Sequence, residues 1–346
     1  MGSEEREAVD RVLQSGIIAQ GPEVAKFEKE FAEMCGVKYA VATSNGTTSG
    51  HLAMLSCGIG PGDEVITTPF TFFATASVIM MARAKPVFVD VEKDGFCLDP
   101  VKAEEAITDN TKAIQPVHLY GELADMPSFQ DVCEKHNLSL IEDSAQAHSS
   151  ESWGQRAGNF GKTGWFSFYP TKNMTASEGG MITTNDSKVA ERCRNMRAHG
   201  MTAQYQHTEF GYNYRMTDIS AAIGRVQLSK LQSFNSRRQE IAENYNAAFS
   251  KYVSVPENRR GHVFHQYTIR CDRRDELRKY LSDHEIGTGV YYPTLLYDYD
   301  PMKHLKAQCP NAEKLIAEVL SLPVHPALTD QNVSTVINTV KSFFEQ

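Results

Sequence analysis

The sequence predicts an α/β fold in which a mainly parallel seven-stranded sheet is followed by a smaller α+β domain. Short β-branched or aromatic runs recur along the first half of the chain with helical stretches between them, and this alternation is typical of a sheet covered by helices on both faces. After about Asp218 the rhythm changes to one long helical segment and then to a short mixture of strands and helices. We therefore expect a large domain over residues 1–235 and a small domain over residues 236–346.

Seven segments are expected to form the strands of the sheet: Tyr39–Thr43, Glu64–Pro69, Lys85–Val91, Lys112–Tyr120, Leu138–Asp143, Gly164–Tyr169 and Gly179–Thr184. A helix is predicted to start at Asp99-Pro100, where a capping carboxylate precedes a proline. Apolar residues three and four positions apart predict another helix over Met126–His136.

After the sheet, a long helix is expected to start at Thr217 or Asp218 and to link the two domains. The small domain is then expected to contain strands at Gln266–Cys271 and Gly289–Pro293, and helices at Asp275–His284, Ala312–Leu320 and Gln331–Phe344.

The composition is that of an ordinary globular protein, with 41% apolar and 23% charged residues. The formal net charge of -8 would repel a phosphate backbone, so nucleic acid is not an expected partner. Seven scattered cysteines with no C-x-x-C pair indicate neither a zinc site nor a disulfide framework. An acidic N-terminus and the lack of a long apolar run predict a cytoplasmic protein with no membrane partner.

A cluster of small polar residues, Ser44–Ser49, follows the first predicted strand and precedes a predicted helix. A strand, a small-residue turn and a helix start bring free backbone N–H groups and hydroxyls together, where a phosphate can bind. An ordinary helix cap is the alternative interpretation of this turn.

Glu142-Asp143-Ser144-Ala145-Gln146 ends the apolar run Leu138–Ile141. A carboxylate at the carboxyl end of such a strand points into the crevice where α/β sheets hold ligands, so Asp143 could pair with a cationic ring. A loop cap or a ribose-binding residue would have the same sequence pattern.

Lys172 lies in the segment Ser167–Asn173, between an aromatic strand and the glycine pair that opens the next strand. A lysine on a short turn beside a sheet edge can be desolvated, which lowers its pKa and frees its amine to form an imine with an aldehyde. A solvated surface lysine is the alternative.

Taken together and in order, these segments resemble the DegT/DnrJ/EryC1/StrS family of pyridoxal-phosphate sugar aminotransferases. The resemblance covers nearly the whole chain and includes Gly21–Val24, Phe27-Glu28, Ser44–Thr48, Pro61–Ile66, Pro69–Phe72, Glu142–Gln146, Ser167–Asn173 and Gly211–Met216. It implies the fold of type I pyridoxal-phosphate transferases, which is the aspartate aminotransferase-like fold.

The resemblance also implies roles for two catalytic residues. Lys172 matches the lysine that holds pyridoxal 5'-phosphate as a Schiff base and afterwards carries the proton. Asp143 matches the carboxylate that keeps the pyridine nitrogen protonated, so that the ring accepts electrons.

Other positions match residues that bind the cofactor or the substrate. The family pattern places the cofactor phosphate against Gly46, Thr47, Thr48 and Ser167, the ring hydroxyl near Gln146 and the ring face against Phe72. It also implies that Asn213 reaches the phosphate of the neighbouring subunit's cofactor and that Tyr291 and Tyr292 contact the substrate. Core packing for Phe72, a turn role for Asn213 and half-buried strand positions for the two tyrosines are the alternatives. His118 and His148 are expected to be structural histidines with satisfied hydrogen bonds.

The function that the resemblance implies is transfer of an amino group from glutamate or glutamine to a nucleotide-linked 3-keto or 4-keto sugar, in a homodimer with shared active sites. One alternative is a sugar dehydratase of the same fold, in which histidine replaces the lysine, and Lys172 argues against it. The other is a non-catalytic regulator or sensor. The sequence departs from the family pattern at Gly50, at Ala176-Ser177 and in its short N-terminus.

Overall fold

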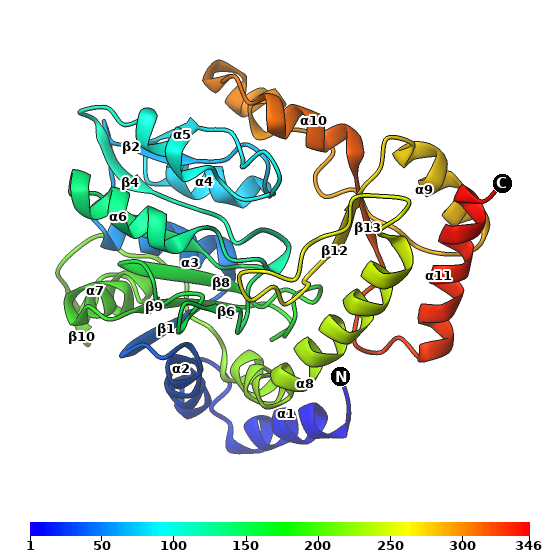
Figure 1. Cartoon of the computed structure of the whole chain (residues 1–346). Helices are drawn as coiled ribbons and strands as arrows, with labels where there is room; N and C mark the ends of the chain where they lie inside the picture. The colour runs from blue at the N-terminus through cyan, green and yellow to red at the C-terminus, as the bar shows by residue number, and fades with distance from the viewer.

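The computed structural model describes residues 1–346 and joins the seven predicted strands in one sheet (Figure 1). The strand order is β1-β9-β8-β5-β4-β2-β3. Five neighbouring strands run parallel, whereas β9 lies antiparallel between β1 and β8. The strands span Tyr39–Thr43 (β1), Glu64–Thr67 (β2), Lys85–Phe88 (β3), Thr111–Ile114 (β4), Ser139–Asp143 (β5), Thr163–Ser167 (β8) and Gly180–Thr184 (β9). The predicted, mainly parallel seven-stranded sheet is confirmed.

The sheet is apolar on both faces because successive side chains of each strand point to opposite sides. On β5, Ile141 packs under helices α3, α4 and α7, whereas Leu140 packs into the larger core on the side of α2 and α6. The covering helices are α2 (Pro22–Cys35), α3 (Gly46–Ser56), α4 (Phe73–Met81), α6 (Met126–His136) and α7 (Ser187–Arg197), and the short helix α5 (Pro100–Glu105) begins after Asp99 as predicted. The predicted layers, with helices on both faces, are therefore present.

Several strands end earlier than predicted. The segment expected as Lys112–Tyr120 forms β4 only over Thr111–Ile114, and Leu119–Gly121 form a 3-10 turn in which Tyr120 has a positive φ of 59°. The chain leaves the sheet at these points, and the carboxyl ends of the parallel strands form the sheet edge described below. Small two- or three-residue strands complete the large unit: β6 (Glu151–Ser152), β7 (Gln155–Arg156), β10 (Met201–Ala203) and β11 (Gln206–His207).

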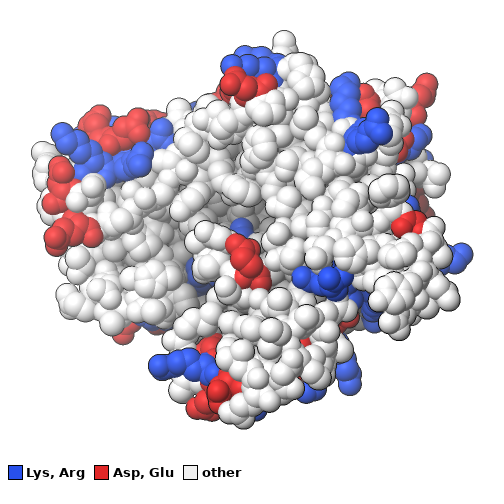
Figure 2. All heavy atoms as spheres, turned by 180° about the vertical axis from the view of Figure 1, so that it is seen from behind, with Lys and Arg blue, Asp and Glu red and all other residues white.

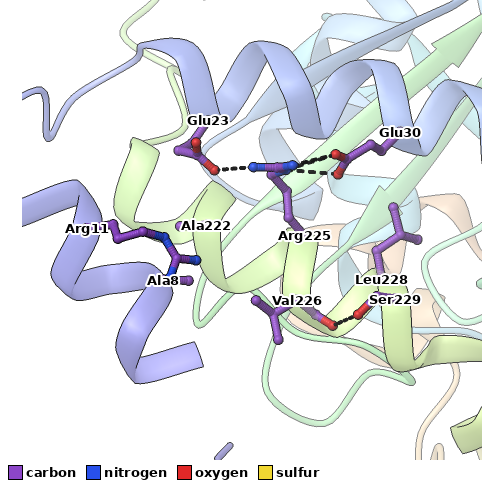
Figure 3. Close-up of a pocket in the computed structure, with 9 residues that line it drawn as sticks. All are labelled: Ala8, Arg11, Glu23, Glu30, Ala222, Arg225, Val226, Leu228 and Ser229. Atoms are coloured by element: carbon purple, nitrogen blue, oxygen red, sulfur yellow. Dashed lines mark hydrogen bonds and ion pairs between the residues drawn. The ribbon is translucent and has the colours of Figure 1, made fainter. Parts of the chain in front are cut away.

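The N-terminal helices are fixed to the long helix α8 (Asp218–Phe249). Asp218, at the start of α8, accepts hydrogen bonds from three backbone N–H groups at the start of α2, which satisfies donors that have no partner within the helix. Two turns further on, Arg225 is held between Glu23 and Glu30 (Figure 3). Helix α1 (Ser3–Ser15) packs against the same stretch of α8.

Helix α8 begins at Asp218 with Thr217 as its N-cap, as predicted, and leads to the C-terminal elements. These are β12 (Tyr267–Arg270), α9 (Arg274–Asp283), α10 (Pro310–Glu318), β13 (Val319–Leu322) and α11 (Asp330–Phe344), with 3-10 turns at Leu296–Asp298 and Asp300–Leu305.

Two expectations for this region were wrong. Gly289–Pro293 form no strand, since only Gly289 bridges to Ser321. The helix predicted over Ala312–Leu320 ends at Glu318, because Val319–Leu322 pair with β12 as an antiparallel strand. A short, largely apolar stretch such as Val319–Leu322 fits either a helix end or a buried strand, and pairing with β12 decided between them.

The C-terminal region contributes to two cores. Residues from Ile241 onward form a separate cluster with β12, β13, α9 and α11. Leu295, Leu296 and Leu315, in contrast, pack into the core of the large sheet. The division into residues 1–235 and 236–346 therefore stays a prediction, and α8 crosses that boundary without interruption.

The surface in Figure 2 carries Lys and Arg side chains close to Asp and Glu side chains, in small groups of mixed sign. None of the helices combines the length and the apolar character needed to cross a lipid bilayer.

Candidate active site

The three segments singled out in the sequence meet at one edge of the sheet. Strands β1, β2, β4, β5 and β8 point in the same direction, so their carboxyl ends lie at the same edge. The turn at Ser44–Thr48 follows β1, Asp143 ends β5, and Ser167 ends β8 just before Lys172.

The turn after β1 presents the N-terminus of α3 to this edge. Asn45 is the N-cap, and the backbone N–H groups of Gly46 and Thr47 make no hydrogen bond within the chain. Gly46 lies so close to the end of β8 that an added Cβ would come within 2.7 Å of the Cβ of Ser167. The structure thus brings Gly46, Thr47 and Ser167 together around two free donors at a helix N-terminus.

Thr48 is already engaged in a capping box with Asn45. Its backbone N–H donates to Asn45 Oδ1 at 2.9 Å, and its hydroxyl donates to the Asn45 carbonyl at 2.8 Å. The helix-cap interpretation therefore holds for Thr48, which stabilises the turn. Gly46 and Thr47 carry its free N–H groups, and the phosphate site stays a prediction.

Asp143 is a buried carboxylate with two hydrogen bonds. Thr75 Oγ1 donates to Oδ2 at 2.7 Å, and the Ala145 N–H donates to Oδ1 at 3.2 Å. Burial raises the pKa of Asp143 to about 6, against these hydrogen bonds and the nearby charge of Lys172. A carboxylate so placed gains from any cation that binds beside it.

Lys172 is half-buried and lines a cavity of about 1370 Å³. Burial lowers the pKa of its amine to about 8, and the negative charge of Asp143 acts in the opposite direction. Lys172 is thus partly shielded from solvent, and its role as a desolvated, imine-forming lysine stays a prediction.

Phe72 and Tyr292 approach each other from different parts of the chain. Phe72 is 56% exposed, so it is not a core residue, and its ring centroid lies 6.1 Å from that of Tyr292. Gln146 joins this group, since its Nε2 donates to the Tyr292 hydroxyl at 3.1 Å and its Oε1 accepts the Tyr120 N–H at 2.8 Å. Tyr291 lines the cavity of Lys172.

Asn213 is exposed and makes an isolated bridge with Ala198. The next residue, Tyr214, accepts a hydrogen bond from the Ser44 N–H at 2.8 Å, so this segment runs beside the turn after β1. Nothing within one chain gives the Asn213 side chain a partner.

The two histidines set aside as structural differ from each other. His118 is satisfied as expected, with Nε2 at 3.1 Å from Glu142 and Nδ1 accepting the Ala124 N–H at 3.1 Å. For His148 the expectation was wrong, because the ring is fully buried and neither nitrogen has a hydrogen-bond partner. Burial, followed by the charge of Lys172, lowers the pKa of His148 to about 3.

The sequence interpretation missed three residues of the site region. Thr75 holds Asp143, His265 Nδ1 lies 3.2 Å from Asn173 Oδ1, and Arg238 lines the cavity with Lys172. The sequence offered a signal for Thr75 alone, as one of the two hydroxyl-bearing residues in the mainly apolar helix α4.

Comparison with known proteins gives matches over essentially the full length. The family model described as the DegT/DnrJ/EryC1/StrS aminotransferase family matches residues 1–341. The pleiotropic regulatory protein of Geobacillus stearothermophilus is 41% identical over 97% of this chain and 93% of its own length. The dTDP-3-amino-3,4,6-trideoxy-alpha-D-glucose transaminase of Streptomyces venezuelae is 37% identical over 98% and 92%.

Solved structures agree with these matches. The crystal structure of S. venezuelae DesV in complex with a ketimine intermediate superposes with a TM-score of 0.97 at 37% identity, covering 99% of this chain and 95% of that one. NtdA from Bacillus subtilis with bound cofactor PMP gives 0.94 at 31%, covering 99% and 82%. The predicted fold class, the aminotransferase class and the vitamin B6 cofactor are thereby confirmed. Both the match over residues 1–341 and the identity to these relatives show that this chain belongs to the DegT/DnrJ/EryC1/StrS aminotransferase family.

Proposed function

We propose that this chain transfers an amino group from glutamate or glutamine to a nucleotide-linked 3-keto or 4-keto sugar, with Lys172 as the residue to which pyridoxal phosphate is attached. The observation that carries the proposal is the placement of Lys172 and Asp143 at one sheet edge, each desolvated and each within reach of the other's charge. Perturbed titratable pairs of this kind are typical of active sites.

The residues present fit pyridoxal phosphate. Gly46 and Thr47 offer free N–H groups for a phosphate, and Gly46 keeps the space beside Ser167 open, which a Cβ would fill. Phe72 exposes an aromatic face, as a ring-stacking residue must. Asp143, a buried carboxylate at the end of β5, would pair with the ring nitrogen.

When bound, pyridoxal phosphate supplies a carbonyl carbon that joins to amines and a ring that accepts electron density. The chain's own residues do the remaining work. Asp143 provides a fixed negative charge, which Thr75 and the Ala145 N–H orient. The Nζ atom of Lys172 can accept and return a proton near neutral pH, because its pKa lies close to 8.

A nucleotide sugar as acceptor is supported by two observations. The cavity beside Lys172, about 1370 Å³, is larger than an amino acid alone requires. Relatives of this chain include, besides the transaminase above, the GDP-perosamine synthase of Escherichia coli O157:H7. Tyr291 and Tyr292 are proposed to contact this substrate.

We also propose a homodimer with shared active sites. Asn213 is exposed, and the segment before it displays two aromatic side chains to solvent, Tyr205 at 82% and Phe210 at 95% exposure. A second copy of the chain that covers these rings would receive Asn213 at its own site. A cytoplasmic location is proposed because all seven cysteines are unpaired.

Two alternative functions, a sugar dehydratase and a non-catalytic regulator, are less well supported. The dehydratase is disfavoured because lysine, not histidine, stands at position 172. A regulatory role has one specific observation in its favour, the name of the Geobacillus relative, but the desolvated lysine and the buried aspartate have no use in a protein that binds no cofactor.

The test is direct. Purified protein is reduced with borohydride, digested and mapped by mass spectrometry, and then assayed with labelled glutamate against a panel of nucleotide keto sugars. Pyridoxyl phosphate on Lys172 and label in one sugar product are expected. Colourless protein that cannot be reconstituted with pyridoxal phosphate would favour the regulator.

A further inference from the structure

The cavity beside Lys172 is cationic in a protein that is acidic overall. Lys172 and Arg238 line it, and Glu285, which is exposed, is its one carboxylate. The chain as a whole carries a formal charge of -8. The excess of acidic residues therefore lies on other parts of the molecule, and no buried carboxylate lines this cavity.

Arg238 is a buried guanidinium without a counter-ion. It is 6% exposed and takes part in no salt bridge. Its Nη1 donates to the carbonyls of Phe264 and His265 at 3.1 and 3.3 Å, its Nε is sealed from solvent without a partner, and its Nη2 makes no hydrogen bond within the chain. Burying an unpaired charge is costly unless a partner of opposite charge arrives.

Another arginine of the same helix shows the contrast. Arg225 lies in a smaller pocket and is held by both Glu23 and Glu30, so its charge is balanced within the chain (Figure 3). Arg225 therefore has a structural role, whereas the charge of Arg238 is left for a group from outside.

We propose that Arg238 is the oxyanion anchor of this site, with Nη2 binding an anionic oxygen of a substrate. The inference rests on the proposed function, in which both substrates are anionic: the amino-acid donor carries carboxylates, and the nucleotide sugar carries a diphosphate. A guanidinium suits either group, because its N–H donors match the spacing of carboxylate and phosphate oxygens.

Three histidines line the cavity. His284 is exposed, with Nδ1 2.8 Å from the Tyr280 carbonyl, and the other two, His265 and His325, are poorly suited to this role. The pKa of His265 lies well below its ordinary value, because of burial and then the charges of Lys172 and Arg238, and the pKa of His325 is lowered by burial and by Arg238. Burial and the neighbouring cations therefore disfavour the charged form of both rings, whereas the guanidinium of Arg238 keeps its N–H donors for an anion.

The test measures binding rather than turnover. Dissociation constants of 2-oxoglutarate, as the dicarboxylate probe, and of dTDP and UDP, as diphosphate probes, are determined by calorimetry for the wild-type holoenzyme and for Arg238→Gln. Arg237→Gln is the matched control, because Arg237 is the next residue along the chain, lies outside the cavity and pairs with Glu240 and Asp330.

Loss of one charge-assisted hydrogen bond predicts that Arg238→Gln weakens one probe roughly ten- to a hundredfold, with Arg237→Gln unchanged. Loss of 2-oxoglutarate affinity identifies the donor carboxylate as the bound group, and loss of nucleotide affinity identifies the diphosphate. Unchanged affinity for all three probes overturns the inference, as does failure of the wild type to bind any of them. Failure of the proposed function would instead show as absence of cofactor on Lys172.

If Arg238→Gln does not fold, the wild-type protein is treated with phenylglyoxal, which modifies guanidinium groups, and mapped by mass spectrometry. Protection of Arg238 by 2-oxoglutarate or by a nucleotide supports the anchor. Modification of Arg238 at an unchanged rate with every probe at saturation contradicts it.

Discussion

Thr75 Oγ1 donates a hydrogen bond of 2.7 Å to Oδ2 of Asp143, and this bond connects helix α4 to the end of strand β5 at the centre of the site. Because a hydroxyl donor favours the ionised carboxylate, Thr75 counteracts the burial that raises the pKa of Asp143 to about 6.

Thr75→Val should raise the pKa of Asp143 further and lower the free energy of unfolding by roughly 1–3 kcal/mol at neutral pH. In the apoprotein the folded-state pKa of this acid exceeds its unfolded value, so the unfolded chain ionises first as pH rises and stability falls between about pH 4 and pH 6. The difference between wild type and variant should therefore be larger above pH 6 than below pH 4. Urea unfolding at several pH values measures it.

Thr75→Ser keeps the hydroxyl and serves as the control. An equal loss of stability in the valine and serine variants would show that packing of the threonine methyl, and not the hydrogen bond, is what matters.

Lys172 should titrate with a pKa of about 8, and Asp143→Asn should lower that value, because removal of the negative charge leaves the ammonium form less favoured. Competitive labelling of the apoprotein with acetic anhydride as a function of pH, followed by peptide mapping, gives the pKa. An exposed lysine such as Lys29 is the internal reference. If Lys172 and Lys29 titrate together, desolvation of Lys172 is refuted.

Replacement of Lys172 by alanine should abolish covalent attachment of the cofactor and reduce turnover by at least about 10²–10⁴-fold, since both the anchor and the proton carrier are lost. Visible absorbance and transamination rate are the two measurements. Substantial turnover in Lys172→Ala would assign the proton transfer to another group.

Gly46→Ala should weaken binding of pyridoxal phosphate, because the new Cβ would lie 2.7 Å from the Cβ of Ser167 and would push the turn after β1 away from the end of β8. Overpacking of this kind costs about 1–3 kcal/mol. Gly60→Ala is the matched control, since a Cβ at Gly60 meets no atom within 4 Å. Equilibrium dialysis of apoprotein against the cofactor measures the effect, and equal affinities of the two variants would contradict a role for the Gly46–Ser167 contact.

Mixing Lys172→Ala chains with Asn213→Ala chains should restore activity if the sites are shared between subunits. Random exchange makes half of the dimers mixed, and each mixed dimer has one intact site of two, so about a quarter of wild-type activity is expected. Each variant alone, carried through the same exchange procedure, is the control. No recovery, although mass spectrometry shows mixed dimers, would place Asn213 outside the shared site.

The sequence by itself determined the layered fold and the order of the site segments. Alternation along β5 sends Ile141 and Leu140 to opposite faces, and residues that follow parallel strands must meet at one edge, so Asp143 and Lys172 could be placed together from local pattern and strand direction.

Only the tertiary structure decided the rest, because these features depend on contacts between residues far apart in the chain. Val319–Leu322 became a strand by pairing with β12, Thr75 acquired its role through Asp143, and Arg238 was left without a carboxylate by the packing of α8 against the cavity. The hydrogen-bond partners and the burial of such residues are set by the assembled fold, so they cannot be predicted from a short stretch of sequence.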